Sequence, residues 1–569
     1  MKALLPFGAL LALTLTHCGS SHGTSPTNIA ASASGNNSVS AGGDDASSGG
    51  TSSTGGSASA AAGSAPRGGD GNTIGGASTL PVGGSGQYPD TFDPNDSPPK
   101  IGEAGCGFDT AAFCDTFGGA SKLGGRSREL DSIFWSAGRM FGAFSTNHAM
   151  PLGMAQIPDC RPDLPGQVWT AQDTLICNPT FDVASGHLLS AVAAQNYGQH
   201  GFRIRQPFDF TGRTGKIVFD GTASPLNSLR GWISLAITED PISLPGYSLR
   251  DNDEGSIIPR NAVEIHFLDA PGQGKMAVRN VHVFRDYEDT FYTPPNDLFA
   301  TYAPGKLNHI EVKVSTAGLE ISISPTSADG LTFDAPMYNY KVNTQLPFSR
   351  GYVHLSVHNH ATIKYTQPDS NSPKVVDASV ALFDNVGFDG NVIANWREYE
   401  VPDSLLKIEG DWASNFQTGP DPYNTGNIGY DIGYQVADQA NAPKQTLKLT
   451  GVDPSNAVSA TLATNFWAEF RGDHDFASYT LRARLNGKNW IEHKFTAKEA
   501  ALLTTKPVTR DASGAQNSST GNQGRYALLL DVPVSDLVPG DNTLEFTTAN
   551  VPTSIPPVVC NVDLILKTQ

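Results

Sequence analysis

The stretch RNAVEIHFLD at residues 260–269 carries two ionisable side chains at a spacing that could support chemistry on a strand. Successive side chains of a β-strand point to opposite faces, so Glu264 and His266 share one face while the apolar residues beside them share the other. A carboxylate beside an imidazole can transfer protons, hydrogen-bond the hydroxyls of a sugar, or simply form the polar face of a sheet. The alternation alone leaves these three roles open.

Other strand-like stretches repeat this division into one apolar and one polar face. They are GWISLAIT, NVHVF and GYVHLSVHNH, in which apolar residues alternate with Trp, His, Ser and Asn. If these strands are neighbours in one sheet, an aromatic ring lies beside several hydrogen-bonding groups, an arrangement that suits the apolar face and the hydroxyls of a sugar. The predicted carbohydrate-binding surface consists of Trp232, Glu264, His266, His282 and His354.

Oxygen ligands for calcium occur at two places in the chain. Asp251 and Asp253 lie in the acidic stretch RDNDEGS, and Asp384 lies in ALFDNVGFDG. Carboxylate oxygens in turns are typical calcium ligands, so calcium is a candidate ligand, although a solvated turn explains the same residues. No CxxC pair or zinc-finger spacing occurs, and we expect that no cofactor is required.

Length and composition indicate several β-rich domains. The chain has 569 residues, of which 17% are charged, with 59 Gly and 38 Pro. This length exceeds a single core, and this composition favours short strands joined by turns. The net charge of −18 argues against nucleic acid as a partner, because a phosphate-binding surface needs concentrated Lys and Arg.

The N-terminus is predicted to be a targeting signal. MKALLPFGALLALTLTHCGSS has one Lys and then an apolar run too short to span a bilayer. It resembles a bacterial lipoprotein signal, in which residues 1–18 end at an acylated Cys18, although His17 stands where a small residue is usual. The resemblance implies an outer-membrane lipoprotein, at the cell surface or in the periplasm. Ordinary secretion is the alternative if Cys18 is not lipidated.

Residues 19–99 are predicted to form a disordered tether. They are mostly Gly, Ser, Ala, Thr and Asn with few large apolar side chains, so they cannot bury enough surface to offset chain entropy. A flexible chain of this length has an end-to-end distance of roughly 50 Å. It would hold the following domains away from the membrane.

Four clustered cysteines agree with an oxidising compartment. They allow three pairings, and short loops favour Cys106–Cys114 and Cys160–Cys177.

The remaining chain is predicted to be all-β. From 100 to 390, short runs with period-2 alternation are separated by turn residues and no long helical period competes, which indicates an antiparallel sandwich of jelly-roll size. Residues 391–569 are predicted to form a second, smaller β-sandwich with one short helix at TAKEAALLTT.

The first sandwich resembles the concanavalin A-like lectin/glucanase superfamily. The resemblance rests on RGWISLAI, VEIHFLD and the closing ALFDNVGFDG, and covers roughly residues 110–390. It implies a jelly roll, but that fold carries lectins, hydrolases and lyases alike. The LNGK and LVPGDNTLEF turns of the second unit resemble those of galactose-binding-like sandwiches, which are often accessory carbohydrate modules.

The resemblance also allows a test for catalysis. Glucanases of this superfamily carry E-x-D-x-E on one strand, and the matching positions here are Glu264, His266 and Leu268. Only the first matches, whereas a retaining glycosidase needs two carboxyls about 5–5.5 Å apart. Alginate-type lyases of this fold carry Q-I-H, and here Glu264 replaces the Gln and would repel a uronate substrate. The sequence therefore favours binding over catalysis.

We therefore predict a monomeric, surface-anchored, non-catalytic lipoprotein that binds a polysaccharide or a cell-surface glycan. The alternative is a polysaccharide-degrading enzyme, a lyase or glycoside hydrolase, in which His266 and Glu264 are catalytic. A further alternative is a structural or adhesion protein whose partners are proteins. An open groove at Trp232, Glu264 and His266 would favour an enzyme if a second acid lay nearby, while a covered face would argue against sugar binding there.

Overall fold

The chain is described by a computed structural model that covers most of the strands expected from the sequence. The described residues are 98–118, 130–143, 167–169, 180–184, 187–193, 199–223, 231–242, 259–270, 275–295, 300–301, 307–327, 332–359, 374–376, 378–401, 428–430, 434–435, 437–438, 446–467, 478–504, 508–514, 516–519, 525–549 and 558–569. The predicted signal, lipidation site and most of the predicted tether lie outside them, as do Cys160 and Cys177.

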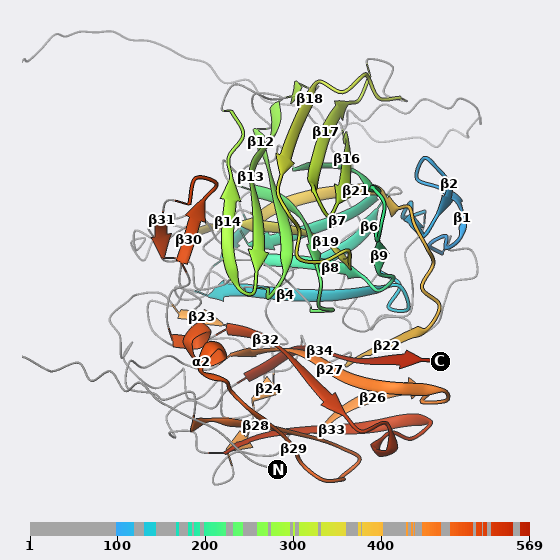
Figure 1. Cartoon of the computed structure of the whole chain (residues 1–569), viewed down its shortest axis with the longest axis vertical. Coiled ribbons are helices and arrows are strands. Elements are labelled where there is room, and N and C mark those ends of the chain that lie inside the picture. Colours follow the sequence, from blue (N-terminus) through green and yellow to red (C-terminus); the bar gives the residue numbers. More distant parts are fainter. Residues whose placement is uncertain are drawn as a thin grey trace, which may run out of the picture. The chain divides into compact units, whose positions relative to one another are not determined.

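The first sandwich contains an eight-stranded antiparallel sheet, called here the back sheet (Figure 1). Its strand order is β18-β17-β16-β10-β21-β7-β6, with β3 paired to β21. The strands are β3 (Phe113–Asp115), β6 (Thr180–Ala184), β7 (His187–Ala193), β10 (Gly215–Ala223), β16 (Asn308–Ser315), β17 (Gly318–Pro325), β18 (Tyr338–Asn343) and β21 (Ala378–Phe388).

The second layer is a twelve-stranded sheet, called here the front sheet, with the order β23-β4-β8-β19-β11-β12-β13-β14-β30-β31. In addition, β15 pairs with β13 and β9 pairs with β19. The strands are β4 (Trp135–Ala143), β8 (Gln199–Ile204), β9 (Phe208–Asp209), β11 (Gly231–Thr238), β12 (Ala262–Ala270), β13 (Lys275–Arg285), β14 (Glu288–Tyr292), β15 (Ala300–Thr301), β19 (Arg350–Asn359), β23 (Ile428–Tyr430), β30 (Val508–Asp511) and β31 (Gln516–Ser519).

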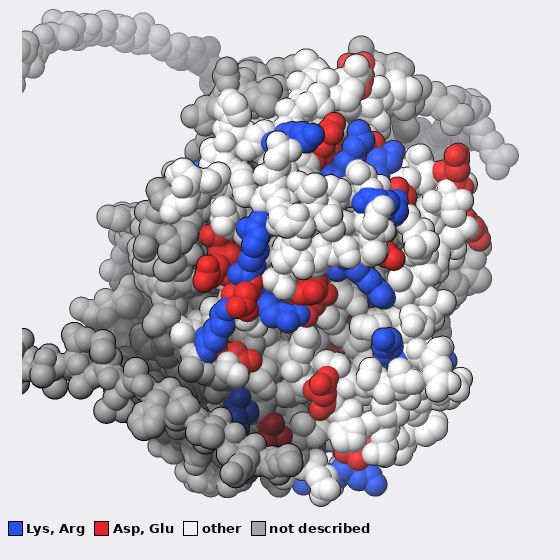
Figure 2. All heavy atoms as spheres, in the orientation of Figure 1, with Lys and Arg blue, Asp and Glu red and all other residues white. Residues whose placement is uncertain are grey.

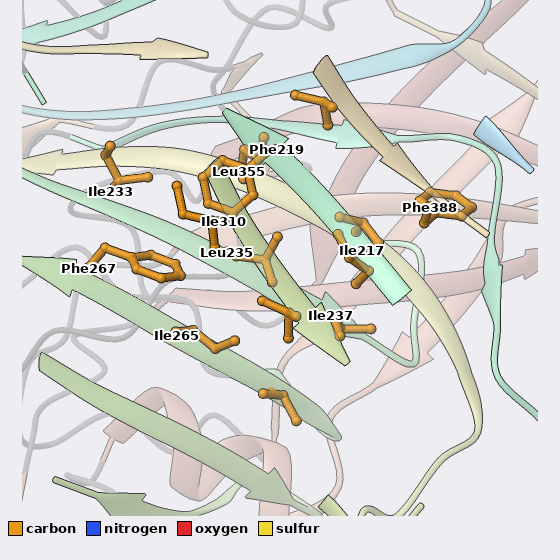
Figure 3. Packing of buried hydrophobic residues seen from close by; sticks show 14 of the residues in the cluster. Ile217, Phe219, Ile233, Leu235, Ile237, Ile265, Phe267, Ile310, Leu355 and Phe388 are labelled. Atoms are coloured by element: carbon orange, nitrogen blue, oxygen red, sulfur yellow. The ribbon is translucent and has the colours of Figure 1, made fainter. Parts of the chain in front are cut away.

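The apolar faces of the two sheets form one core, as the alternation predicts. Figure 3 shows Ile217 and Phe219 of β10 packed with Leu235 of β11 and with Ile265 and Phe267 of β12. All five side chains are fully buried. The prediction of an all-β sandwich is therefore confirmed.

A bulge in β21 changes the alternation at its closing end. Asn385 has a φ of 47°, and the pairing of β21 with β10 shifts register between Val218 and Asp220. A bulge inserts one residue into a strand and so re-aims the side chains around it. Phe383 and Val386 both reach the core as a result.

A short disulfide-linked hairpin precedes the first sandwich. It consists of β1 (Glu103–Gly105) and β2 (Phe108–Ala111), and the predicted Cys106–Cys114 disulfide is present with a Cα–Cα distance of 5.7 Å. The predicted Cys160–Cys177 disulfide lies outside the described residues. The bond ties the hairpin to β3 of the back sheet.

Asp115, at the end of β3, is a buried carboxyl that hydrogen-bonds the core. Its Oδ2 accepts a hydrogen bond of 2.8 Å from Trp135 Nε1, and its Oδ1 accepts one of 2.8 Å from the backbone N–H of Phe117. Burial raises the pKa of Asp115 to about 6, an effect that these hydrogen bonds reduce and that Asp131 and Asp384 add to.

The second sandwich has its own core between two five-stranded sheets. One sheet has the order β22-β34-β27-β32 with β24 on β34, and the other has the order β25-β33-β28-β29 with β26 on β33. The strands are β22 (Trp396–Glu400), β24 (Tyr434–Gln435), β25 (Ala437–Asp438), β26 (Thr446–Val452), β27 (Ala457–Trp467), β28 (Thr480–Leu485), β29 (Ile491–Lys494), β32 (Arg525–Val532), β33 (Gly540–Ala549) and β34 (Val558–Thr568). A separate two-stranded sheet pairs β5 (Gln167–Trp169) with β20 (Lys374–Val376).

Two local signals in this sandwich follow directly from its sequence. The turn after β28 places Asn486 and Gly487 at φ angles of 51° and 66°, the left-handed pair that a tight hairpin requires. The predicted helix is α2 (Ala497–Thr504). Its N-terminus is capped by two hydrogen bonds, in which Glu499 N donates to Thr496 Oγ1 and Thr496 N donates to Glu499 Oε2.

A 3-10 turn, η5 (Val534–Asp536), precedes β33. In the described part of the chain, no helix has the length and apolarity needed to cross a membrane.

The chain beyond residue 390 also contributes to the first sandwich. β23 pairs with β4 at one edge of the front sheet, and β30 pairs in parallel with β14 at the other. Residues 77–569 form one compact unit. The predicted domain limits of 100–390 and 391–569 stay a prediction, and in the described residues strands from beyond residue 390 extend both edges of the front sheet.

Replacing Asp115 with Asn should change the pH dependence of stability. Because the folded-state pKa is raised to about 6 from 3.8, the folded chain keeps this proton at pH values where the unfolded chain has lost it. The stability that the protonated carboxyl contributes is present below about pH 4 and is lost as the pH rises through about 6, by about 3 kcal/mol.

Urea unfolding at a series of pH values measures this effect. The free energy of unfolding of Asp115→Asn minus that of the wild type should rise between about pH 4 and 6 and level off above. Asp109→Asn, at an exposed position of the neighbouring strand β2, is the control for the same substitution at a carboxyl that is not buried. Parallel curves for Asp115→Asn and wild type would contradict the assignment.

Candidate functional site

The register of the front sheet aligns the predicted site residues in rows across its strands. Directly opposed residues of neighbouring antiparallel strands lie side by side on the same face. The first row runs through Ser136, Arg203, His354, Ala236, Glu264, His282 and Phe291. Three of the predicted residues, Glu264, His282 and His354, therefore occupy one row.

The next row contains His266 and a run of small residues. Its members are Gly138, Gly201, Ser356, Ser234, His266 and Asn280. Ser234 Oγ and Ser356 Oγ form a hydrogen bond of 2.6 Å across the two central strands. We call the face of the front sheet that carries these two rows the polar face.

Trp232 occupies the third row, two residues along β11 from Ser234. Its backbone pairs with His358 and Leu268, and its side chain lies outside the described atoms. The strand pairing thus gathers all five predicted carbohydrate-binding residues on neighbouring positions of one sheet.

The polar face is buried in this structure. Glu264 and His266 are each 1% exposed, His282 is 0% exposed and His354 is 3% exposed. The polar side of these strands is therefore neither an exposed surface nor an open groove at these residues. This burial argues against direct sugar contact in this conformation, and the sugar-binding role of these side chains stays a prediction.

The buried carboxyl and imidazole groups of the polar face lie in pairs. His266 Nε2 lies 3.0 Å from Glu264 Oε1 on the same strand, and His282 Nδ1 lies 2.9 Å from Asp289 Oδ2 on β14. The rings of His266 and His282 are 5.1 Å apart. An isolated charge is costly to bury, so a buried carboxyl is tolerated where it has a polar partner such as these imidazoles.

His354 differs from the other two histidines because it faces a cation. Burial, together with the nearby charge of Arg203, lowers the pKa of His354 well below its usual value of 6.5. Its Nε2 hydrogen-bonds Thr238 Oγ1 at 2.8 Å. His354 is therefore neutral near pH 7 and acts as a polar contact rather than as a charge.

At the β4–β8 end of the first row, Arg203 joins the front sheet to the second sandwich. Its guanidinium forms a two-pronged ion pair with Glu398 of β22, with 3.1 Å from Nη1 to Oε2. Asp563 of β34 lies 3.8 Å from the same guanidinium and accepts a 2.8 Å hydrogen bond from Ser136 Oγ. Side chains of Arg203, Glu398 and Asp563 are each at most 1% exposed.

Arg205 extends this ion network. Its Nη1 donates to the backbone carbonyl of Glu398 at 2.6 Å, and its Nη2 lies 3.8 Å from Glu400 Oε2. These two arginines were not among the predicted site residues. The alternation of HGFRIR could have placed both on the polar face, but their acidic partners lie about 200 and 360 residues later in the chain.

The calcium candidates are only partly covered by the described residues. Asp251 and Asp253 lie outside them. Asp384 lies on β21 of the back sheet, where its Oδ1 accepts a 2.7 Å hydrogen bond from the N–H of Asn385. Within the described residues, no group of three or more His, Cys, Asp or Glu side chains is arranged to hold a metal ion. Calcium binding stays a prediction.

The visible surface carries charges of both signs. Figure 2 shows Lys and Arg side chains interspersed with Asp and Glu across the described part of this face. In the back sheet, the carboxylate of Glu311 lies 3.2 Å from Lys216 Nζ and 3.3 Å from Lys313 Nζ. This face therefore has no extended surface of one sign.

Comparisons with known proteins give a likeness to solved structures alone. No family model matches the sequence, and no curated protein matches it. The chain is similar to the carbohydrate-binding module CBM66 from Bacillus subtilis, with 14% identity over 37% of this chain and 92% of that chain and a TM-score of 0.21.

Two further similar structures are lectin-related or sugar-bound by their descriptions. A legume lectin-like domain from Entamoeba histolytica has 9% identity over 38% of this chain and 88% of that chain, with a TM-score of 0.26. The VIP36 exoplasmic/lumenal domain, in its Ca²⁺/Man3GlcNAc-bound form, has 13% identity over 38% and 83%, with a TM-score of 0.24. Scores this low carry no argument about function, and the two-sheet architecture rests on the strand pairing given above.

Replacing Arg203 with Met should destabilise the protein strongly, because Glu398 would be left as a buried, unpaired carboxylate. Removing one partner of a buried ion pair costs about 3–5 kcal/mol. Lys313→Met is the matched control, since Lys313 is 46% exposed in its ion pair with Glu311, and an exposed pair contributes less than about 1 kcal/mol. Urea unfolding measures both differences.

The double variant Arg203→Met with Glu398→Leu should recover much of this loss, because it removes the second charge as well. If Arg203→Met cost no more than Lys313→Met, the network would not hold the two sandwiches together.

Proposed function

We propose that this chain is a non-catalytic carbohydrate-binding protein anchored at a bacterial surface. The observation that carries the proposal concerns Glu264. Glucanases of the resembled superfamily carry acids at three positions of this strand, and of the matching positions in β12 only Glu264 has a carboxyl. Its Oε1 lies 3.0 Å from His266 Nε2, and both side chains are buried. The loss of two of the three acids favours binding over cleavage for a sandwich of the resembled type.

The same pairing disfavours a glycoside hydrolase. A retaining glycosidase needs two carboxyls that reach the glycosidic bond, whereas Glu264 is buried and faces an imidazole. The other buried acid of this face, Asp289, is likewise held by His282 at 2.9 Å. Neither acid is placed to protonate a glycosidic oxygen.

A lyase is disfavoured for a related reason. His266 would have to take a proton from a uronate, but its Nε2 faces Glu264 rather than solvent. The negative charge of Glu264 would repel the carboxylate of such a substrate. The buried histidines therefore support the sheet in this proposal.

The rest of the proposal concerns location and partners. The signal resemblance and the Gly/Ser-rich segment support a lipid anchor at Cys18 and a tether that carries the sandwiches away from the outer membrane. The partner would be a polysaccharide or a cell-surface glycan, and the protein would act as a monomer, with calcium as a candidate ligand.

Binding without turnover is the result expected when the protein is tested against polysaccharides. Affinity electrophoresis in gels that contain laminarin, xylan, mannan, starch, pectin or alginate should show retarded migration with at least one of them. The same incubations should release neither reducing ends nor products that absorb in the ultraviolet.

Two outcomes would contradict this proposal. An ultraviolet-absorbing product that disappears in His266→Ala would establish a lyase instead. Failure to bind any glycan would remove the carbohydrate class and leave a protein-binding adhesion role.

Cys18→Ala should release the protein from the membrane. Cells fed an alkyne analogue of palmitate should label the wild type and not the variant, because only the thiol of Cys18 can carry the diacylglycerol. The variant should move from the membrane fraction to the soluble fraction. Label retained by Cys18→Ala would show that the anchor is elsewhere.

A further inference from the structure

The outer face of the back sheet carries a second row of polar side chains, on the side of the sandwich opposite to the polar face. The register aligns Asp384 of β21, Asp220 of β10, His309 of β16 and Ser324 of β17. Directly opposed residues on one face of a sheet have Cβ atoms about 5 Å apart. The row therefore places an imidazole between a carboxylate and a hydroxyl.

Asp220 orients the imidazole of His309. Asp220 Oδ1 lies 2.6 Å from His309 Nδ1, and the side chain of Asp220 is 3% exposed while that of His309 is 27% exposed. A carboxylate can only accept a hydrogen bond, so Nδ1 of His309 carries the proton. The other ring nitrogen, Nε2, is left to accept a hydrogen bond when His309 is neutral or to donate one when it is charged.

The bulge in β21 completes the support beneath His309. Asn385, the residue with the positive φ, donates from Nδ2 to Asp220 Oδ2 at 2.7 Å. Both oxygens of the buried carboxylate are thus engaged, one by the imidazole and one by the amide. The position of His309 is fixed from below, as in sites that hold a side chain ready for a ligand.

An exposed aromatic ring lies against this imidazole. The rings of Phe333 and His309 are 5.1 Å apart, and Phe333 is 39% exposed. The position of Phe333 is held by a bridge to Thr326, and Asp334 N donates to Pro325 O at 2.9 Å. A single exposed apolar side chain is ordinary at a protein surface, but here the ring is held in place beside an imidazole that Asp220 orients.

We propose that His309 and Phe333 form a binding subsite for one neutral pyranose unit of a glycan. Phe333 offers an apolar face for the C–H groups of the sugar ring, and His309 Nε2 offers a hydrogen-bonding group at its edge. The inference rests on the proposed function and assigns a site to it. It places this site on the back sheet, away from Trp232, Glu264 and His266.

The charges around the subsite favour a neutral sugar over an acidic one. Asp220 contacts His309 directly, and Asp384 lies one strand further along the same row, so a uronate at His309 would meet carboxylates of its own sign. The cations nearest along β10 and β16, Lys216 and Lys313, are each paired with Glu311. They leave little positive charge to attract an acidic glycan.

The test uses the full chain in affinity electrophoresis against neutral glycans (laminarin, xylan, mannan and starch) and acidic ones (alginate and pectin). Phe333→Leu keeps an apolar side chain but removes the ring, and His309→Ala removes the imidazole. Each should weaken binding of a neutral glycan about tenfold, the effect of losing one stacking or hydrogen-bonding contact. Phe333→Trp restores an aromatic face and should bind at least as well as the wild type.

The control is Ile133→Ala, which removes an apolar side chain that is 64% exposed elsewhere on the first sandwich and should leave binding unchanged. Thermal unfolding of each variant separates loss of binding from loss of fold. Retention of a glycan by Phe333→Leu and His309→Ala at wild-type strength would overturn this subsite and leave the proposed function standing. If Phe333→Leu and His309→Ala weakened binding of alginate or pectin alone, the assignment of a neutral sugar to the subsite would be overturned. No retention of any glycan by the wild type would overturn the proposed function, and the subsite with it.

Discussion

The cost of burying charge is the constraint on which the arrangement of the front sheet depends. One face of this sheet packs into the apolar core, and the other carries arginine, histidine and carboxylate side chains that are also excluded from solvent. Such groups are tolerated only where each finds a partner. Arg203 finds Glu398, and His282 finds Asp289. The pairing of Arg203 also attaches β22 and β34 of the second sandwich to the first.

The same constraint applies to β12, the strand that resembles a glucanase strand. Glu264 and His266 of β12 face away from the core, are both buried and lie 3.0 Å apart, so each is a polar partner of the other. The outer face of the back sheet has the opposite character. There a buried carboxylate, Asp220, supports the partly exposed His309 beside an exposed ring, so hydrogen-bonding capacity is directed outward.

Local patterns in the sequence were sufficient to predict that the chain forms strands and which side of a strand a residue faces. Period-2 alternation predicted that Ile265 faces the core and Glu264 the opposite side, and both positions are confirmed. The sequence likewise predicted the Asn486–Gly487 turn and the helix that begins after Thr496. The bulge at Asn385 was not predicted: it shifts the alternation so that Phe383 and Val386 both face the core, and its position became clear only from the pairing with β10.

Alternation along a strand is a local property, because the geometry of the backbone sends successive Cβ atoms to opposite faces. The sequence alone was therefore enough to predict an all-β chain whose strands have a polar and an apolar side. It could not decide whether the polar side meets water. That depends on segments far away in the chain, such as Asp563, which hydrogen-bonds Ser136 across 427 residues. Burial, ion pairing and the meeting of His309 with Phe333 arise only when distant strands are brought together, so they belong to the tertiary structure.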